Sequence, residues 1–142
     1  MLKHKKILVC ISGGIAAYKS LSLIRLLVKA GAEVRVLATQ NALEFITPLS
    51  IETLSKNKLY SDTFDSSNFF QTQHIAYSDW ADCMIVAPAT ANILGKFAHG
   101  IADDALSSLY LAFSKPIFIA PAMNTAMYTH VAVQENMQSL KK

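Results

Sequence analysis

The sequence ILVCI at Ile7–Ile11, followed directly by SGGIAAYK at Ser12–Lys19, decides how this chain is expected to fold. A continuous apolar run that ends at a glycine pair is typical of a strand buried on both faces, as in a parallel sheet. Residues 14–29 then have helical periodicity, Gly31 ends this helix, and residues 33–38 predict a second strand. The chain therefore opens with one β-α-β unit.

The same alternation continues to the end of the chain. Residues 84–87 and 117–120 predict two more buried strands, and residues 61–73 predict a loop. Further helices are predicted at 48–56 (capped by Thr47, with Pro48 at its first position), 91–97, 103–112 (capped by Asp103 or Asp104) and 129–140. The 142 residues fit one domain. The predicted fold class is α/β, a doubly wound, Rossmann-like or flavodoxin-like parallel sheet with helices on both faces.

The composition limits the classes of protein that fit the chain. Apolar residues make up 52% and charged residues 16%, against roughly 25% charged in typical soluble domains, so we expect partner subunits to cover part of the surface. The net charge of +3 comes largely from terminal lysines, not from a basic face of the kind that binds nucleic acid. No apolar run is long enough for a membrane span or a secretory signal. We therefore expect a cytoplasmic protein without a nucleic-acid or membrane partner.

The cysteines and most histidines carry no strong signal for chemistry. Cys10 and Cys83 lie inside apolar runs and outside any metal-binding spacing, so we interpret them as buried, reduced thiols and expect no metal site. A lone histidine is more often a surface or packing residue than a base, and this interpretation applies to His4, His99 and His130. His74 is set apart only by the residues around it.

The residues that follow each strand form the candidate site, because ligands bind outside the carboxyl ends of the strands in such sheets. Residues 12–15 favour a phosphate or anion cradle, and a tight turn without a ligand is the alternative. Residues 39–41 suit hydrogen bonds to a ligand or, equally, the cap of a helix. Residues 87–92 and 120–124 both begin with Ala-Pro and continue with small residues and an Asn, which leaves room for a flat ring.

Several sequence blocks, in this order, resemble one protein family: SGGIAAYK at Ser12–Lys19, FITPLS at Phe45–Ser50, HIAYSDWAD at His74–Asp82, APATAN at Ala87–Asn92 and PAMNTAMY at Pro121–Tyr128. The family is that of the homo-oligomeric flavin-containing cysteine decarboxylases, and the resemblance covers nearly the whole chain. It is greatest to the decarboxylase half of the bifunctional coenzyme A biosynthesis protein. The histidine and PAMN blocks are specific in order and spacing, whereas the glycine block alone is not.

The resemblance implies FMN as the cofactor. The residues that it implies as cofactor-binding are Ser12, Gly13, Gly14, Ile15, Thr39, Phe45, Thr90, Ala91, Asn92 and Ala122. Within this set, Phe45 would pack against the flavin ring. His74 matches the active-site base of the family, and Asn124 matches the residue that binds and orients the substrate carboxylate. Met127 lies in the same block, on the substrate side.

The activity implied by the resemblance is FMN-dependent decarboxylation of 4'-phosphopantothenoylcysteine to 4'-phosphopantetheine in coenzyme A biosynthesis. Two alternatives stay open: oxidative decarboxylation of a peptide C-terminal cysteine, as by lantibiotic-type flavoproteins, and flavin binding by a non-catalytic partner subunit. A nucleotide-binding domain without flavin would make the histidine and PAMN blocks a coincidence. The family also implies a homotrimer or a higher homo-oligomer such as a dodecamer. Its substrate-covering flap follows the last helix, so we expect residues 1–142 to be a flavoprotein domain without that flap.

Overall fold

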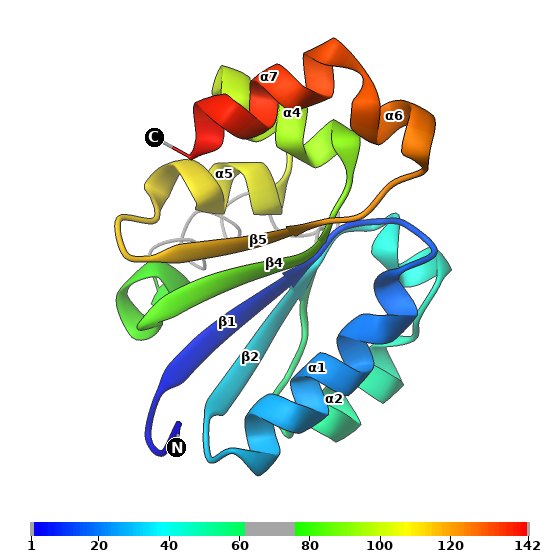
Figure 1. Ribbon diagram of the computed structural model, residues 1–142. Coiled ribbons are helices and arrows are strands. Elements are labelled where there is room, and N and C mark those ends of the chain that lie inside the picture. Colours follow the sequence, from blue (N-terminus) through cyan, green and yellow to red (C-terminus); the bar gives the residue numbers. More distant parts are fainter. Residues whose placement is uncertain (1, 62–75, 142) are drawn as a thin grey trace.

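The centre of the molecule is a five-stranded, entirely parallel sheet with the strand order β3-β2-β1-β4-β5. The computed structural model describes residues 2–61 and 76–141. Figure 1 shows the strands fanning out from the edge at which their carboxyl ends converge. The strands are β1 (Lys6–Ile11), β2 (Glu33–Ala38), β3 (Tyr60–Ser61), β4 (Cys83–Ala89) and β5 (Ile117–Pro121).

Strand β1 is central because its side chains are apolar on both sides of the sheet. Ile7 pairs with Val34 of β2 and with Cys83 of β4. Leu8 and Cys10 belong to one hydrophobic cluster, whereas the other apolar residues of β1 belong to a second. Side chains alternate between the two faces of a strand, so one continuous apolar run supplies both cores.

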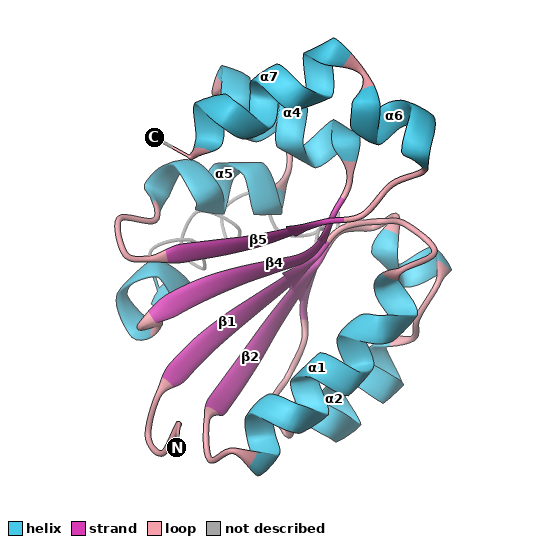
Figure 2. Ribbon diagram, in the orientation of Figure 1, coloured by secondary structure: helices cyan, strands magenta, loops and turns pink. Residues whose placement is uncertain are grey.

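Helices cover both faces of the sheet, which confirms the predicted fold class (Figure 2). One face carries α1 (Ala17–Lys29) and α2 (Pro48–Ser55), and the short 3-10 helix η1 (Ala42–Glu44) precedes α2. The other face carries α4 (Ala91–His99) and α5 (Ala105–Ala112), with α7 (Val131–Leu140) packed against α4. The short α6 (Thr125–Thr129) links β5 to α7.

The strand order places a topological switch point between β1 and β4. The chain moves outward from β1 through β2 to β3, and then crosses back to β4 and β5 on the other side of β1. This order is the Rossmann arrangement and not the flavodoxin one, and it opens a crevice where the two halves of the sheet diverge. The pairing of β4 with β5 shifts register between Val86 and Ala89, next to this crevice.

The predicted helix signals are confirmed at several positions. Thr47 caps α2 through its side-chain oxygen, and Pro48 is the first helical residue. Gly31 and Gly100 adopt the left-handed conformation after α1 and α4. Asp104, and not Asp103, caps α5 in a capping box with Ser107. These caps satisfy backbone groups that the helix ends would otherwise leave without partners.

Three predicted segments differ from the structure. The helix expected at 129–140 is present as α7 but begins two residues later, at Val131, because the extended backbone of His130 separates it from the short helix α6, which was not predicted. The Nδ1 atom of His130 accepts a hydrogen bond from the Ala132 amide and so starts a new helix. Helix α1 begins at Ala17, three residues later than predicted. Ser61, expected in a loop, ends β3, and the remainder of the predicted loop lies largely outside the described residues.

Lys115 ties the helical turn at 76–80 to the amino end of β5. Its ammonium group donates hydrogen bonds to the carbonyl oxygens of Ser78 (2.9 Å), Asp79 (3.0 Å) and Ala81 (2.6 Å). A cation at a helix C-terminus satisfies the last carbonyl groups and the negative end of the helix dipole. This contact fixes the turn that leads from residues 76–81 into β4.

Candidate cofactor and substrate pocket

A cleft of about 890 Å³ lies at the carboxyl edge of the sheet, at the switch point. It is built mainly from the turns that follow β1, β2, β4 and β5, and this volume lies within the range that cofactor and substrate sites occupy. The sequence-predicted site residues that line it are Ser12, Gly13, Gly14, Ile15, Thr39, Thr90, Ala91, Asn92, Ala122, Asn124 and Met127. Four separate segments of the sequence therefore meet at one cleft.

Ser12 locks the turn after β1 to the turn after β4. Its side chain is almost fully buried; the hydroxyl donates to the Pro88 carbonyl and accepts from the Thr90 amide at 3.2 Å. The Ser12 amide also donates to the Pro88 carbonyl, at 3.3 Å. Through these bonds Ser12 holds the two turns in register at the lining of the cleft.

The turn that follows Ser12 has the chemistry of an anion cradle. A Cβ atom added at Gly13 would overlap Asn41 Cβ and would come within 2.8 Å of the Asn41 carbonyl carbon, so only glycine fits there. Within the described part of the chain, the amides of residues 13–16 donate no hydrogen bond. These donors precede the 13-residue helix α1, whose dipole favours negative charge at this end.

Two threonine side chains shape the turns after β2 and β4. Thr39 Oγ1 accepts from the Ala42 amide at 3.2 Å in the turn after β2, whereas Asn41, the N-cap of η1, makes no side-chain cap bond. Thr90 Oγ1 accepts from the Ile93 amide at 3.2 Å and starts α4. Among the described residues neither hydroxyl donates, so each one has a hydrogen available for a ligand in the cleft.

Asn124 presents a neutral hydrogen-bond donor to the cleft. Its Oδ1 atom accepts from the Met127 amide at 2.9 Å and caps α6. The residue lines the cleft, and with its oxygen held by the helix the Nδ2 group has no acceptor among the described residues. Both Nδ2 hydrogens are therefore free to bind a carboxylate. Met127 stands one helical turn further on and is 44% exposed.

The cleft also contains an ion pair that the analysis of the sequence missed. Lys96 of α4 lines it, and the Nζ atom lies 2.8 Å from Asp103 Oδ1 and 3.0 Å from Asp104 Oδ2. The hydrogen bond that Lys96 donates to Asp103 is the largest influence on the pKa of Lys96 and raises it, against a smaller opposing effect of burial. Partial burial works to raise the pKa of Asp104, but hydrogen bonds from Ser107 and Lys96 outweigh it and lower that pKa.

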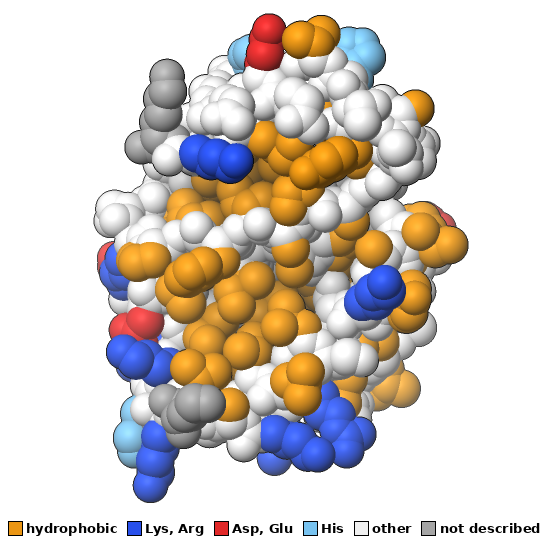
Figure 3. Space-filling model, in the orientation of Figure 1, with side chains coloured by type: hydrophobic (Ala, Val, Ile, Leu, Met, Phe, Trp, Pro, Cys, Tyr) orange, Lys and Arg blue, Asp and Glu red, His pale blue; other side chains and the backbone are white. Residues whose placement is uncertain are grey.

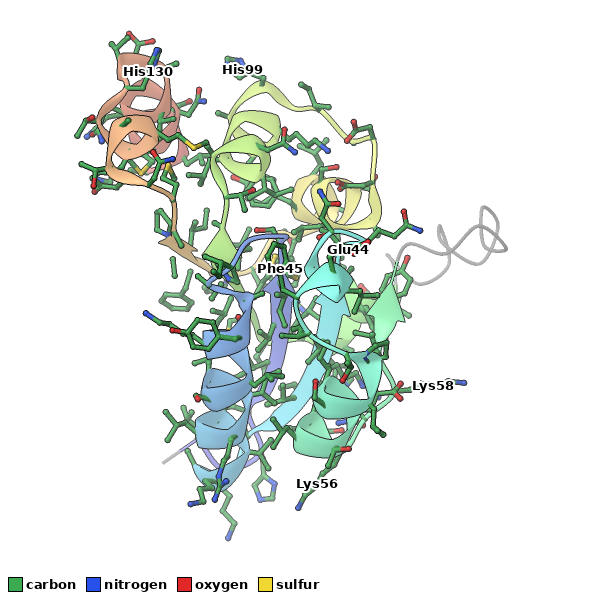
Figure 4. The ribbon with its side chains drawn as sticks, turned by 90° about the vertical axis from the view of Figure 1, so that its right-hand side faces the viewer. Glu44, Phe45, Lys56, Lys58, His99 and His130 are labelled. Atoms are coloured by element: carbon green, nitrogen blue, oxygen red, sulfur yellow. The ribbon has the colours of Figure 1, made fainter. Side chains whose placement is uncertain are left out.

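Two sequence-predicted residues are not placed at the cleft. Phe45, expected to pack against a flavin ring, follows η1 with half of its side-chain surface exposed and is not among the residues that line the cleft (Figure 4). His74 lies outside the described residues, so its role stays a prediction. His99 and His130 lie toward one end of the molecule, and each has an asparagine or backbone partner.

Neither a metal cluster nor a membrane span is found in the described parts of the chain. Over residues 2–61 and 76–141, no three His, Cys, Asp or Glu side chains are grouped as metal ligands. Over the same ranges, no helix combines the length and the apolar character needed to cross a membrane.

A doubly wound α/β sheet with an anion cradle and neutral donors at its switch point defines a class of mononucleotide-binding proteins. Comparison with known proteins narrows this class. The chain matches the family described as Flavoprotein over residues 1–142. It is 50% identical over 140 residues to the coenzyme A biosynthesis bifunctional protein CoaBC of Bacillus subtilis (strain 168), covering 99% of this chain and 34% of that protein.

A second relative matches over most of its own length. The chain is 46% identical over 140 residues to the probable phosphopantothenoylcysteine decarboxylase of Streptococcus mutans serotype c, covering 97% of this chain and 78% of that one. The crystal structure of SpaF, described as an FMN-dependent cysteine decarboxylase, superposes with a TM-score of 0.88 at 34% identity, covering 99% of this chain and 81% of that one. The chain belongs to the flavoprotein family, and it spans about a third of the length of the bifunctional relative.

Proposed function

We propose that this chain uses FMN to decarboxylate 4'-phosphopantothenoylcysteine to 4'-phosphopantetheine. The observation that carries the proposal is the place of Asn124, which lines the same cleft as the glycine turn while its Oδ1 atom is held by α6. The relatives named for coenzyme A biosynthesis and for phosphopantothenoylcysteine decarboxylation support this substrate.

The residues present fit FMN. The turn at Gly13 and Gly14 provides amides at the amino end of α1 that have no acceptor among the described residues and are available to a phosphate, and glycine at position 13 lets this turn pack closely against Asn41. Thr39 and Thr90 offer hydroxyl hydrogens, and Ala91 and Ala122 leave space beside them. When bound, FMN supplies a two-electron acceptor that these side chains lack.

In the proposed reaction the protein binds and orients the substrate. Asn124 holds the carboxylate through neutral hydrogen bonds, because a cationic clamp would stabilise the charged ground state against loss of carbon dioxide. His74 moves the proton, as suits a side chain that titrates near neutral pH. The net reaction replaces the carboxylate by hydrogen, releases carbon dioxide and leaves the oxidation state of the cofactor unchanged.

The test is an absorption spectrum followed by an assay of released carbon dioxide. We expect the purified protein to show flavin bands and to release carbon dioxide from 4'-phosphopantothenoylcysteine. Release only from a peptide with a C-terminal cysteine would favour the peptide alternative. Flavin bands with no release from either substrate would indicate a non-catalytic subunit, and a protein that does not bind added FMN would refute the proposal.

The same proposal includes a homotrimer or a larger homo-oligomer in the cytoplasm. Figure 3 shows apolar side chains gathered across one face of the molecule. Exposed apolar residues include Phe118 on the edge strand β5 (59% exposed) and Ile15 at the cleft (79%), and contiguous apolar surface of this kind marks an interaction site. Sedimentation equilibrium is expected to give three or more times the chain mass of 15.5 kDa. A mass of one chain at micromolar concentration would refute the assembly.

A further inference from the structure

Lys96 is the one cationic side chain that lines the cleft within residues 2–61 and 76–141. It lies on α4, two turns beyond Thr90, and 17% of its side chain is exposed. The two aspartates that bind it differ in their exposure. Asp104 lines the cleft, and 21% of its side chain is exposed. Asp103 is not among the residues that line the cleft, and 60% of its side chain is exposed. Lys96 and Asp104 are thus the charged side chains that line the cleft within the described residues, and charges in a partly closed site act more strongly than they would in water.

The hydrogen bonds of this cluster leave one donor of Lys96 available. Asp104 Oδ1 accepts from the Ser107 amide (2.8 Å) and hydroxyl (2.6 Å), and Oδ2 faces Lys96. An ammonium group has three donors, and two are directed to Asp103 and Asp104. In the described structure the third has no acceptor, while the side chain borders the cleft. The aspartates therefore orient Lys96 and keep it protonated without occupying all of its donors.

We propose that Lys96 contacts the bound cofactor and favours its reduced, negatively charged form over its oxidised, neutral ring. This inference rests on the proposed function, because it takes FMN as the occupant of the cleft. A fixed positive charge at a flavin ring stabilises the added electrons, and such charges are a means by which proteins tune flavin chemistry. Asp103 and Asp104 are positioning residues in this arrangement, since they act through Lys96.

The test is the midpoint potential of bound FMN in wild type and in Lys96→Gln, measured with the full chain. Loss of a charge-assisted hydrogen bond is expected to weaken the preference for reduced over oxidised FMN about tenfold. For a two-electron couple this corresponds to a midpoint about 30 mV lower. The affinity for oxidised FMN is expected to change less than threefold, and Lys96→Arg is expected to restore most of the potential.

Asp103→Asn is the matched control, because its expected effect on the midpoint potential of bound FMN is opposite in sign or zero. It removes a negative charge beside Lys96 but leaves the cation and the lining of the cleft in place, so the midpoint is expected to stay the same or to rise. If Lys96→Gln lowered the unfolding midpoint but left the midpoint potential of bound FMN unchanged, the ion pair would be structural only. That result would overturn the inference. A wild-type protein that failed to bind FMN would instead refute the proposed function.

Discussion

Gly13→Ala is expected to destabilise the fold by about 2 kcal/mol and to remove FMN binding at micromolar cofactor concentration. The added methyl group would overlap Asn41 Cβ, and it would also come within 2.8 Å of the Asn41 carbonyl carbon and 3.1 Å of the Ala42 amide nitrogen. Backbone atoms cannot move aside as a flexible side chain can, so the turns after β1 and β2 must separate. The measurements are urea unfolding without cofactor and fluorescence titration with FMN.

Gly14→Ala is the matched control for this prediction. Within the described residues, a Cβ at Gly14 would meet only Thr90 Cγ2, at an ordinary contact distance of 3.5 Å. Stability is therefore expected to change by less than about 0.5 kcal/mol, whereas FMN affinity falls if the cofactor approaches the glycine backbone closely. An unfolding midpoint of Gly13→Ala equal to that of wild type would contradict the packing argument. Unchanged FMN affinity in both variants would place the cofactor elsewhere.

The sequence was sufficient to predict the fold because the apolar runs are long enough to identify strands. ILVCI at Ile7–Ile11 favours burial on both faces, and a parallel sheet covered by helices on both sides provides it. The candidate site followed from the same reasoning, since the residues after parallel strands converge at one edge. Ser12, Thr39, Thr90 and Asn124 come from distant parts of the sequence, yet all of them line the cleft.

Features that depend on side-chain geometry could not be predicted in this way. Lys96 lies within α4, away from any strand end, and its pairing at the cleft with Asp104, the cap of α5, depends on how the two helices pack. The break at His130 depends on its ring accepting from a backbone amide, which periodicity does not encode. The roles of the residues in the turn after β1 also depend on geometry. The Ser12 hydroxyl is buried and bonded to two partners, whereas the amides of residues 13–16 donate no hydrogen bond within the described residues.

Asn124→Asp is expected to lower kcat/KM for decarboxylation at least 100-fold while leaving the fold intact. Aspartate caps a helix as well as asparagine does, so the bond to the Met127 amide is kept and stability changes by less than about 0.5 kcal/mol. The change replaces the amide donors at the cleft by a negatively charged acceptor, which repels a substrate carboxylate. Removal of one such positioned donor costs about 100-fold to 1,000-fold in other enzymes. The measurement is carbon dioxide release at saturating FMN.

Asn124→Ser separates the loss of the donor group from the added charge. A serine cap also accepts a hydrogen bond from the Met127 amide. Unlike aspartate it adds no negative charge, and unlike asparagine it has no amide hydrogens. If the amide donors bind the carboxylate, Asn124→Ser loses a large part of the activity, and Asn124→Asp loses more because repulsion is added. Both variants should bind FMN with wild-type affinity. A variant of either kind that decarboxylated at more than half of the wild-type rate would show that Asn124 only starts α6, and the carboxylate would then have to be bound by another donor in the cleft.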